Sequence, residues 1–447
     1  MKTKLQVYIL GLMVMFPLIV SAQNTMLSLN EALKLAKENN KSLKSKSYDE
    51  EYAKEEIRIS QSNMLPSVNA SGNYSYYFDR QVIFMPGSFT GNENEPVVDV
   101  AVGGKNTFNT FVSLSQPILN ESARRQIKAA KLQNVIAELN TKDARSSLVV
   151  DVSAIYLRIL LIQETIKLNQ QSLDRNKRSL ADSRSLYAQG KSLKVDTLRN
   201  FIVVENLKTT IGHLENQNKV SALHLKQVLG LDVKTEVVLS DSLKHDVEVR
   251  YFAAVETSYQ DVFLNRPDIQ QKQLNVELSR SQLSQSNAMR MPTISLIGAY
   301  QIQAQADNRK FESYRWPKTS FVGLQANIPL FSGNRINSRI RQSNISLQKS
   351  QLEYSDAKEK AETEIAMLEN NLKEVFQRLA IQEKTVQAAQ MNFNIVNDRY
   401  KNGLSSRLEL SDAELSLTEA KMNQLHSIYN VKIAKLQLDK ALGLLQY

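Results

Sequence analysis

Side chains that could catalyse a reaction or hold a metal ion occur in this chain, but they form no known catalytic or metal-binding pattern. The sequence has no cysteine, which excludes thiolate metal sites, a cysteine nucleophile and disulfide bonds. It has no HExxH, Walker A, GxGxxG or GxSxG motif. His213 and His224 share an expected helix but stand three turns apart, too far to bind one metal ion, and His245 and His426 are isolated. We therefore expect no catalytic residue, no metal site, no cofactor and no enzymatic activity.

The excess of basic residues does not indicate a nucleic-acid partner. The formal net charge is +10, but Lys and Arg are interleaved with Asp, Glu, Asn and Gln along the whole chain and form no concentrated patch. We interpret this charge as the solvated surface of helices and expect no binding to nucleic acid.

The first 22 residues have the features of a secretory signal peptide. Lys2 and Lys4 supply a positive start, an apolar stretch follows at 7–20, and Ser21 and Ala22 complete a small-residue cleavage site. We expect the mature chain to begin at Gln23, outside the cytoplasm. The mature part has no run of 18 apolar residues, so we expect no membrane-spanning helix, and any membrane segment must consist of strands.

Two stretches of more than a hundred residues each are almost free of helix breakers. Proline is absent from 118–266 and after Pro329. In both stretches apolar residues recur in alternating steps of three and four, which is a heptad stripe. We expect long helices at 121–188 and 333–402, each about 100 Å long at 1.5 Å per residue.

The two heptad stripes superimpose at a constant offset of 213 residues. The matched pairs include Val152 with Ile365, Ile166 with Leu379, Tyr187 with Tyr400 and Gly190 with Gly403. Self-similarity over this length indicates an internal duplication of one structural unit. Each half is expected to be a helix, two strands, a long helix, a turn and a shorter helix.

The duplication divides the mature chain into two repeats and a connecting segment. In the first repeat (23–230) the expected elements are a helix at 28–63, strands at 67–78 and 107–116, and helices at 121–188 and 193–229. In the second repeat (266–447) they are a helix at 266–290, strands at 293–304 and 319–328, and helices at 333–402 and 406–443. Residues 231–265 are the connecting, equatorial segment.

The four expected strands alternate apolar and polar residues over about 9–11 residues, the length of a tilted membrane strand. A soluble sheet with one buried face would show the same alternation. The export signal and the aromatic residues near strand ends (Tyr76, Tyr77, Phe78 and Tyr300) favour lipid. Four strands cannot close a barrel, and an open edge in lipid leaves backbone groups unpaired, so several chains must combine. The residues alone permit a dimer or a trimer.

Several short motifs occur along the chain in a particular order. They are Ser28-Leu-Asn-Glu-Ala-Leu-Lys-Leu-Ala36, Leu65-Pro-Ser-Val68, Ser115-Gln-Pro-Ile118, Arg266-Pro-Asp-Ile269, Ile328-Pro-Leu-Phe331 with Gly333, and the Tyr-x-x-Gly turns at Tyr187 and Tyr400. Each motif is weak alone, but their order together with the duplication is specific. In this combination the sequence resembles the TolC-type outer-membrane efflux and secretion channels over essentially the whole mature chain.

The resemblance implies a mainly helical fold with a membrane β part. Three chains would form a homotrimer whose twelve-stranded β-barrel is continuous with a twelve-helix α-barrel, and the helical part would lie in the periplasm of a Gram-negative cell. The partners would be outer-membrane lipid, a periplasmic adaptor (membrane fusion protein) and an inner-membrane transporter. The chain would be the passive exit duct of a tripartite efflux pump or a type I secretion system. Whether the cargo is a drug, a metal or a protein is left open.

The resemblance also places candidate gate residues at the tips of the helical hairpins. The two acidic residues that narrow the closed pore in the family correspond to Glu409 and Asp412, its gate tyrosine corresponds to Tyr400, and an acidic partner corresponds to Asp196. The turn glycines Gly190 and Gly403 mark the tip at which the adaptor would dock.

One position departs from the family pattern. Ser405 stands where the best-known member has an arginine that ties the gate shut, and Arg407 follows two residues later. The interaction that closes this gate is therefore undetermined. One hypothesis is a pair between Arg407 and Asp196.

The same residues also have structural explanations. Ser406 and Glu409 have the spacing of a capping box, and an acidic residue in the first turn is favoured by the helix dipole. Tyr400 is the last member of the heptad stripe, so it is equally expected to pack in the core. At the level of the whole chain, the alternative to a channel is a soluble periplasmic coiled-coil adaptor.

Overall fold

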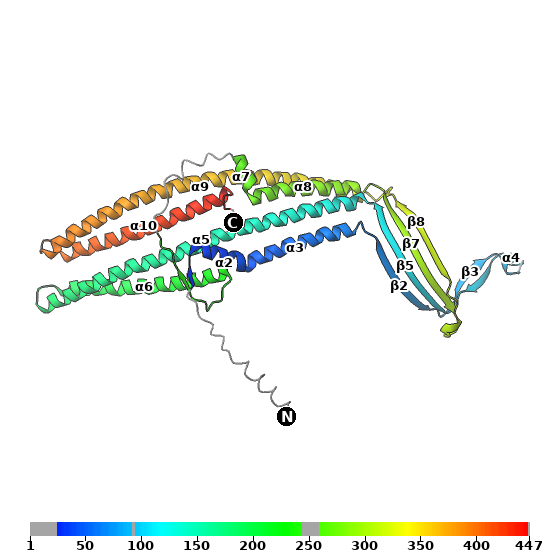
Figure 1. Cartoon of the computed structure of the whole chain (residues 1–447), viewed down its shortest axis with the longest axis horizontal. Helices are drawn as coiled ribbons and strands as arrows, with labels where there is room; N and C mark the ends of the chain where they lie inside the picture. The colour runs from blue at the N-terminus through cyan, green and yellow to red at the C-terminus, as the bar shows by residue number, and fades with distance from the viewer. Residues whose placement is uncertain (1–24, 92–93, 244–258, 446–447) are drawn as a thin grey trace, which may run out of the picture. The chain divides into compact units, whose positions relative to one another are not determined.

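The structure is a computed structural model that describes residues 25–91, 94–243 and 259–445. The expected signal peptide (1–22) lies outside the described residues, as does the part of the connecting segment at 244–258. The chain divides into two compact units (Figure 1). One unit comprises the described residues within 1–46, 141–267 and 358–447, and the other comprises 47–140 and 268–357. Each unit draws residues from both sequence repeats, so the units do not coincide with the repeats.

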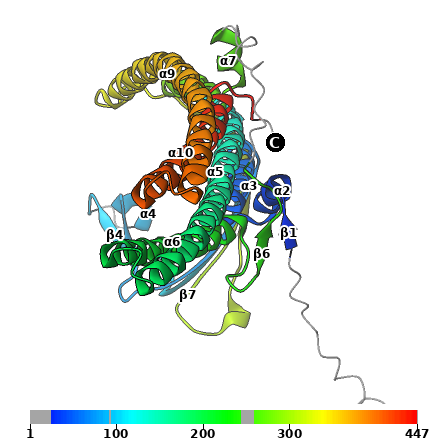
Figure 2. The same cartoon turned by 90° about the vertical axis from the view of Figure 1, so that its left-hand side faces the viewer.

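The first unit consists mainly of long helices. Its elements, whole or in part, are β1 (Thr25–Leu27), α2 (Leu29–Asn39), α3 (Lys41–Ser62), α5 (Glu121–Ala188), α6 (Lys194–Leu229), β6 (Val237–Leu239), α7 (Tyr259–Asn265), α9 (Arg335–Lys401) and α10 (Arg407–Ala441). Within this unit α9, α10, α5 and α6 lie side by side in that order (Figure 2). Their heptad stripes meet in one hydrophobic core in which Tyr156, Ile365, Leu372 and Leu438 are almost fully buried.

Helix α5 contains an 18-residue window with a mean hydropathy of 1.5, although the sequence has no uninterrupted apolar run of that length. Half of that window is buried inside the protein. Val152, Tyr156 and Ile159 of the same helix belong to the core of the first unit. A core helix therefore accounts for this composition.

The expected helix at 28–63 is interrupted, because Asn40 separates α2 (Leu29–Asn39) from α3 (Lys41–Ser62). Asn40 has an extended backbone, and its side-chain Oδ1 accepts a hydrogen bond from the N–H of Leu43 at 2.9 Å. An Asn side chain that caps a new helix in this way competes with continuation of the old one. The Asn40 amide also donates to the carbonyl oxygen of Val228 at 2.8 Å, which holds the break against α6.

The start of the described chain is held by a capping box and by a buried tyrosine. The Ser28 hydroxyl accepts from the N–H of Glu31, whose carboxylate accepts from the N–H of Ser28 at 2.7 Å. The Tyr156 hydroxyl lies 2.8 Å from both the Leu27 carbonyl oxygen and Asp241 Oδ2, so two acceptors share its single proton. Burial and the neighbouring Asp241 raise the pKa of Tyr156 above its ordinary value.

The second unit contains a four-stranded antiparallel sheet in the order β2 (Ser67–Tyr76), β5 (Asn106–Leu119), β7 (Thr293–Ala306) and β8 (Lys318–Asn327). It also holds most of α3, α8 (Pro267–Ala288) and the remaining parts of α5 and α9. A small hairpin of β3 (Gln81–Met85) and β4 (Val98–Val102), with the short helix α4 (Gly87–Thr90), lies between β2 and β5 in the chain. The sequence patterns had not indicated this hairpin.

The strand register gives the sheet one apolar face and one polar face. Val68 pairs with Leu114, which pairs with Gly298, which pairs with Val322, and all four side-chain positions lie on one face. One residue along, Asn69 pairs with Ser113 on the opposite face. On that face the Gln301 side chain of β7 donates a hydrogen bond of 2.8 Å to the Asn109 side chain of β5. In the described strands β2 and β8 are hydrogen-bonded on one side only, so each leaves an open edge.

Candidate functional site

The candidate site is formed by the two tight turns that connect α5 to α6 and α9 to α10. Gly190 and Gly403 adopt left-handed backbone conformations with φ of 69° and 74°. In each turn the glycine N–H donates to the tyrosine carbonyl three residues earlier, and the following N–H donates to the carbonyl five residues earlier. The donor–acceptor pairs are Gly190–Tyr187 (2.9 Å), Lys191–Leu186 (2.8 Å), Gly403–Tyr400 (3.0 Å) and Leu404–Arg399 (2.8 Å). Both turns are therefore Schellman motifs, which require a residue that tolerates positive φ.

The α9–α10 turn brings Arg407 onto Tyr400. The guanidinium carbon of Arg407 lies 5.6 Å from the centre of the Tyr400 ring, within cation–π distance. Both residues are half-buried. Arg407 forms no ion pair with Asp196 among the described residues, where its guanidinium lies over Tyr400 instead. The reason is geometric: the first turn of α10 folds the arginine back onto its own hairpin.

Glu409 combines capping with a fixed negative charge. Its N–H donates to the Ser406 hydroxyl at 3.2 Å, which caps α10, while its carboxylate accepts a hydrogen bond from the Ser405 hydroxyl. The Ser405 hydrogen bond, with a contribution from the charge of Arg399, lowers the pKa of Glu409 below its ordinary value. The exposed carboxylate is therefore ionised at neutral pH.

Asp412 and Asp196 have no side-chain partner in the described chain. Asp412 is exposed on α10, three residues after Glu409. Asp196 is half-buried in the first turn of α6, where the N-cap residue Leu193 offers no side-chain hydrogen bond. A carboxylate in this position interacts favourably with the positive end of the helix dipole. Both carboxylates are available to solvent ions or to another chain.

A buried charged cluster that sequence reasoning had missed lies two turns beyond Arg407. Glu414 on α10 is only 7% exposed, and its Oε2 is buried with no hydrogen-bond partner in the described residues. Arg175 on α5 contacts the same stretch of α10, with a hydrogen bond of 3.5 Å to Thr418 Oγ1. Burial raises the pKa of Glu414, while the charges of Arg407 and Arg175 partly offset that effect.

The spacing of Glu414 could have revealed this cluster. Glu414 lies four residues after Leu410 and three before Leu417, and both leucines are buried. A charged residue at that spacing falls on the buried stripe of its helix. The arrangement carries fixed charges and a ring–cation contact but no catalytic geometry. Among the residues that the structure describes, no group of three or more His, Asp or Glu side chains could hold a metal ion.

Comparisons with known proteins identify the group to which this fold belongs. The outer membrane efflux protein family matches residues 32–231 and 258–444. The chain is 21% identical over 435 residues to the proteases secretion protein PrtF of Dickeya chrysanthemi, which covers 91% of this chain and 87% of that protein. It is 23% identical over 421 residues to the toluene efflux pump outer membrane protein TtgF of Pseudomonas putida, with coverage of 93% and 83%.

Among solved structures, the fold is similar to the CmeC outer membrane channel of Campylobacter jejuni, with a TM-score of 0.77 at 17% identity. That match covers 93% of this chain and 85% of the other. Family, relatives and fold agree on a channel and lend no support to a soluble adaptor. The chain therefore belongs to the outer membrane efflux protein family and is an outer-membrane efflux channel.

Proposed function

We propose that this chain is one protomer of a homotrimer, in which three four-stranded sheets close a twelve-stranded β-barrel that continues into a twelve-helix α-barrel. The observation that carries this proposal is the two-faced sheet with open edges at β2 and β8. The apolar face, which includes Val68, Leu114 and Val322, suits contact with outer-membrane lipid, and the face that includes Asn109 and Gln301 suits a water-filled lumen. In lipid, both edges must be paired by strands of other chains.

The same protomer forms the exit duct of a tripartite assembly. The relatives include a protease secretion protein and a toluene efflux pump component, which carry unlike cargoes. One duct architecture therefore serves both type I secretion and small-molecule efflux, and the cargo is selected by the inner-membrane transporter. A periplasmic adaptor joins the transporter to the hairpin tips at Gly190 and Gly403. The duct is passive, because the energy for transport comes from the transporter. The duct itself catalyses no reaction.

The gate of this duct lies at the α9–α10 turn. Glu409 and Asp412 of three chains would form two rings of negative charge that attract cations into a narrow pore. Tyr400 and Arg407 hold the turn of each protomer in one conformation through their 5.6 Å contact. Asp196 has no side-chain partner among the residues that the structure describes and is available to a neighbouring protomer.

Cross-linking between the two open edges tests the proposal directly. Because the chain has no native cysteine, an engineered pair reports only on itself. Ser71→Cys on β2 is combined in turn with Thr319→Cys, Phe321→Cys, Gly323→Cys or Gln325→Cys on β8, all on the polar face of the sheet. We expect oxidation of membranes to yield, for one register, a product of about three times the mass of one chain, since paired strands bring Cβ atoms within reach of a disulfide.

Single-cysteine variants are the control, because a chain with one thiol forms dimers at most. A pair of Ser71→Cys with Val322→Cys, whose side chains lie on opposite faces, should not cross-link. A product that stops at two chains would replace the trimer by a dimeric barrel. If none of the four registers produced any inter-chain product, the edges would not be paired and the barrel would be excluded.

A further inference from the structure

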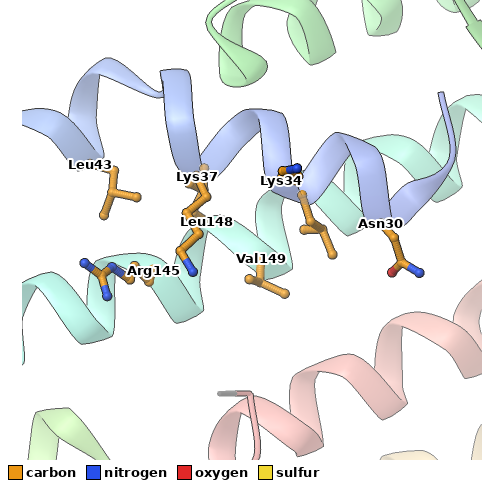
Figure 3. Close-up of a pocket in the computed structure, with 8 residues that line it drawn as sticks. Asn30, Lys34, Lys37, Leu43, Arg145, Leu148 and Val149 are labelled. Carbon is orange, nitrogen blue, oxygen red and sulfur yellow. The ribbon is translucent and has the colours of Figure 1, made fainter. Parts of the chain in front are cut away.

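A pocket in the first unit is lined by residues that have no assigned role in a channel. It lies between α2, the first turn of α3 and α5, with a volume of about 290 Å³ (Figure 3). Its lining residues are Asn30, Leu33, Lys34 and Lys37 of α2, Leu43 of α3, and Arg145, Leu148 and Val149 of α5. All of them belong to the first unit. The pocket is therefore a property of the helical unit and does not depend on the barrel.

The interior of this pocket is apolar. Leu33, Leu43, Leu148 and Val149 form its walls, and Leu43 and Val149 are each only 7% exposed to solvent. A cavity of roughly 150 Å³ is enough to hold a benzene ring. The larger volume here accommodates an alkyl group of several carbons.

Three cationic residues line the same pocket. Lys34 and Lys37 on α2 and Arg145 on α5 line it, and no carboxylate does. Figure 3 shows the Lys37 side chain extending from α2 toward α5, on the side where Arg145 lies. In the described part of the chain none of the three forms an ion pair or a hydrogen bond, and Arg145 Nε is buried without an acceptor. A buried guanidinium nitrogen without an acceptor costs free energy, which a bound anion would recover.

We propose that this pocket binds a single-chain aliphatic carboxylate, with the alkyl chain between the leucines and the carboxylate at Lys37 and Arg145. The apolar lining residues indicate the alkyl chain, and the cationic lining residues indicate the carboxylate. A small inorganic anion would leave the apolar walls wet, and a neutral alkyl compound would leave the three cations uncompensated. Arg145 supplies the forked donor geometry that matches a carboxylate, and Lys37 adds a second positive charge.

Titration calorimetry with the full chain in amphipol tests the proposal, with decanoate below its micelle concentration as the probe. We expect saturable binding of one decanoate per chain. Decanol, which has the chain without the charge, and acetate, which has the charge without the chain, should each bind at least about tenfold more weakly. Binding of decanol as tight as that of decanoate would overturn the proposal.

Substitutions locate the site. Lys37→Gln combined with Arg145→Gln should weaken decanoate binding at least about tenfold, because each removes a charged hydrogen-bond donor. Lys37→Gln alone changes only an exposed side chain, so a smaller loss there reports on the site without risk to folding. Lys41→Gln, which alters an exposed lysine on α3 outside the pocket, is the matched control and should change nothing. Equal affinities for the double variant and the control, or no saturable binding because a second chain covers the pocket, would contradict the assignment.

Discussion

The guanidinium group of Arg407 lies over the ring of Tyr400, with 5.6 Å between the guanidinium carbon and the ring centre. This contact joins the first residue of α10 to the last turn of α9. Ser405 stands where the resemblance to known channels places an arginine that ties the gate shut, and Arg407 follows two residues later. The α9–α10 turn thus has a contact within its own hairpin, and Asp196 has no side-chain partner among the described residues.

Removal of the Arg407–Tyr400 contact should loosen the tip. A half-buried cation–π contact is worth about 1 kcal/mol, so Arg407→Ala should raise the open population of the channel about fivefold. Arg407→Lys keeps the charge but loses the planar stacking and should show an intermediate effect. Single-channel recording in planar bilayers measures this change.

The control for that substitution is Arg378→Ala on α9, which removes an exposed arginine that pairs with Glu374 one turn away. Such surface pairs contribute little. Indistinguishable recordings from the Arg407→Ala and Arg378→Ala proteins would exclude a gating role for the contact.

Asp412→Asn should reduce cation selectivity and weaken block by multivalent cations. The Asp412 carboxylate is exposed near the turn and unpaired in the described chain, so in a trimer it would contribute three charges to one ring. Reversal potentials in a salt gradient and titration with a trivalent cation measure the two effects. Asp398→Asn, which removes a carboxylate 3.8 Å from Lys401, is the comparison. The charged-ring hypothesis fails if Asp412→Asn leaves both quantities unchanged.

Gly403→Ala should destabilise the protein by about 1 kcal/mol, because alanine is strained at a φ of 74°. The strain is purely local, since a Cβ at this position would meet no atom within 4 Å. Gly403→Asn should cost less, as asparagine tolerates the left-handed region. Thermal unfolding measures both effects.

Gly212 offers a control of opposite sign. It lies inside α6 without a positive φ, and a Cβ added there would also meet no atom within 4 Å. Gly212→Ala should therefore stabilise the protein by about 0.5–1 kcal/mol through helix propensity. Similar effects from the two alanine substitutions would mean that the turn conformation does not limit residue choice at Gly403.

Glu414→Gln should raise the melting temperature near pH 7.5 and have little effect near pH 4. Burial raises the pKa of Glu414 in the folded protein above its unfolded value. The stability that this group contributes is therefore fully present below the unfolded pKa and is lost as the pH rises through the folded pKa. Glutamine mimics the protonated acid and removes that loss. Scanning calorimetry at the two pH values measures the difference.

Glu419→Gln, which changes an exposed acid on the same helix, should show no such pH dependence. A lower melting temperature for Glu414→Gln near pH 7.5 would reverse the interpretation. It would mean that the ionised carboxylate is a net stabilising counter-ion for Arg407 and Arg175.

Much of the secondary structure could be predicted because its signals are local. The heptad stripe predicts a helix at 121–188, and α5 spans Glu121–Ala188. The turn glycines work in the same way, because a left-handed residue is required wherever a Schellman motif ends a helix. The break at Asn40 was not predicted, because it depends on a contact between distant segments. The Asn40 side chain caps α3 while its amide is held by the carbonyl oxygen of Val228.

The sequence by itself predicted the long helices, the alternating strands and the turns, because each depends on a periodicity of 3.6 or two residues or on a single backbone conformation. The tertiary structure decided which side chains of different helices contact one another near the tip. Arg175 and Thr418 are 243 residues apart, and their contact depends on which face α10 turns to α5. Likewise Lys37 and Arg145 line one pocket only because α2 and α5, which are distant in the sequence, both border it. Contacts of this kind depend on packing between distant segments, which no local pattern encodes.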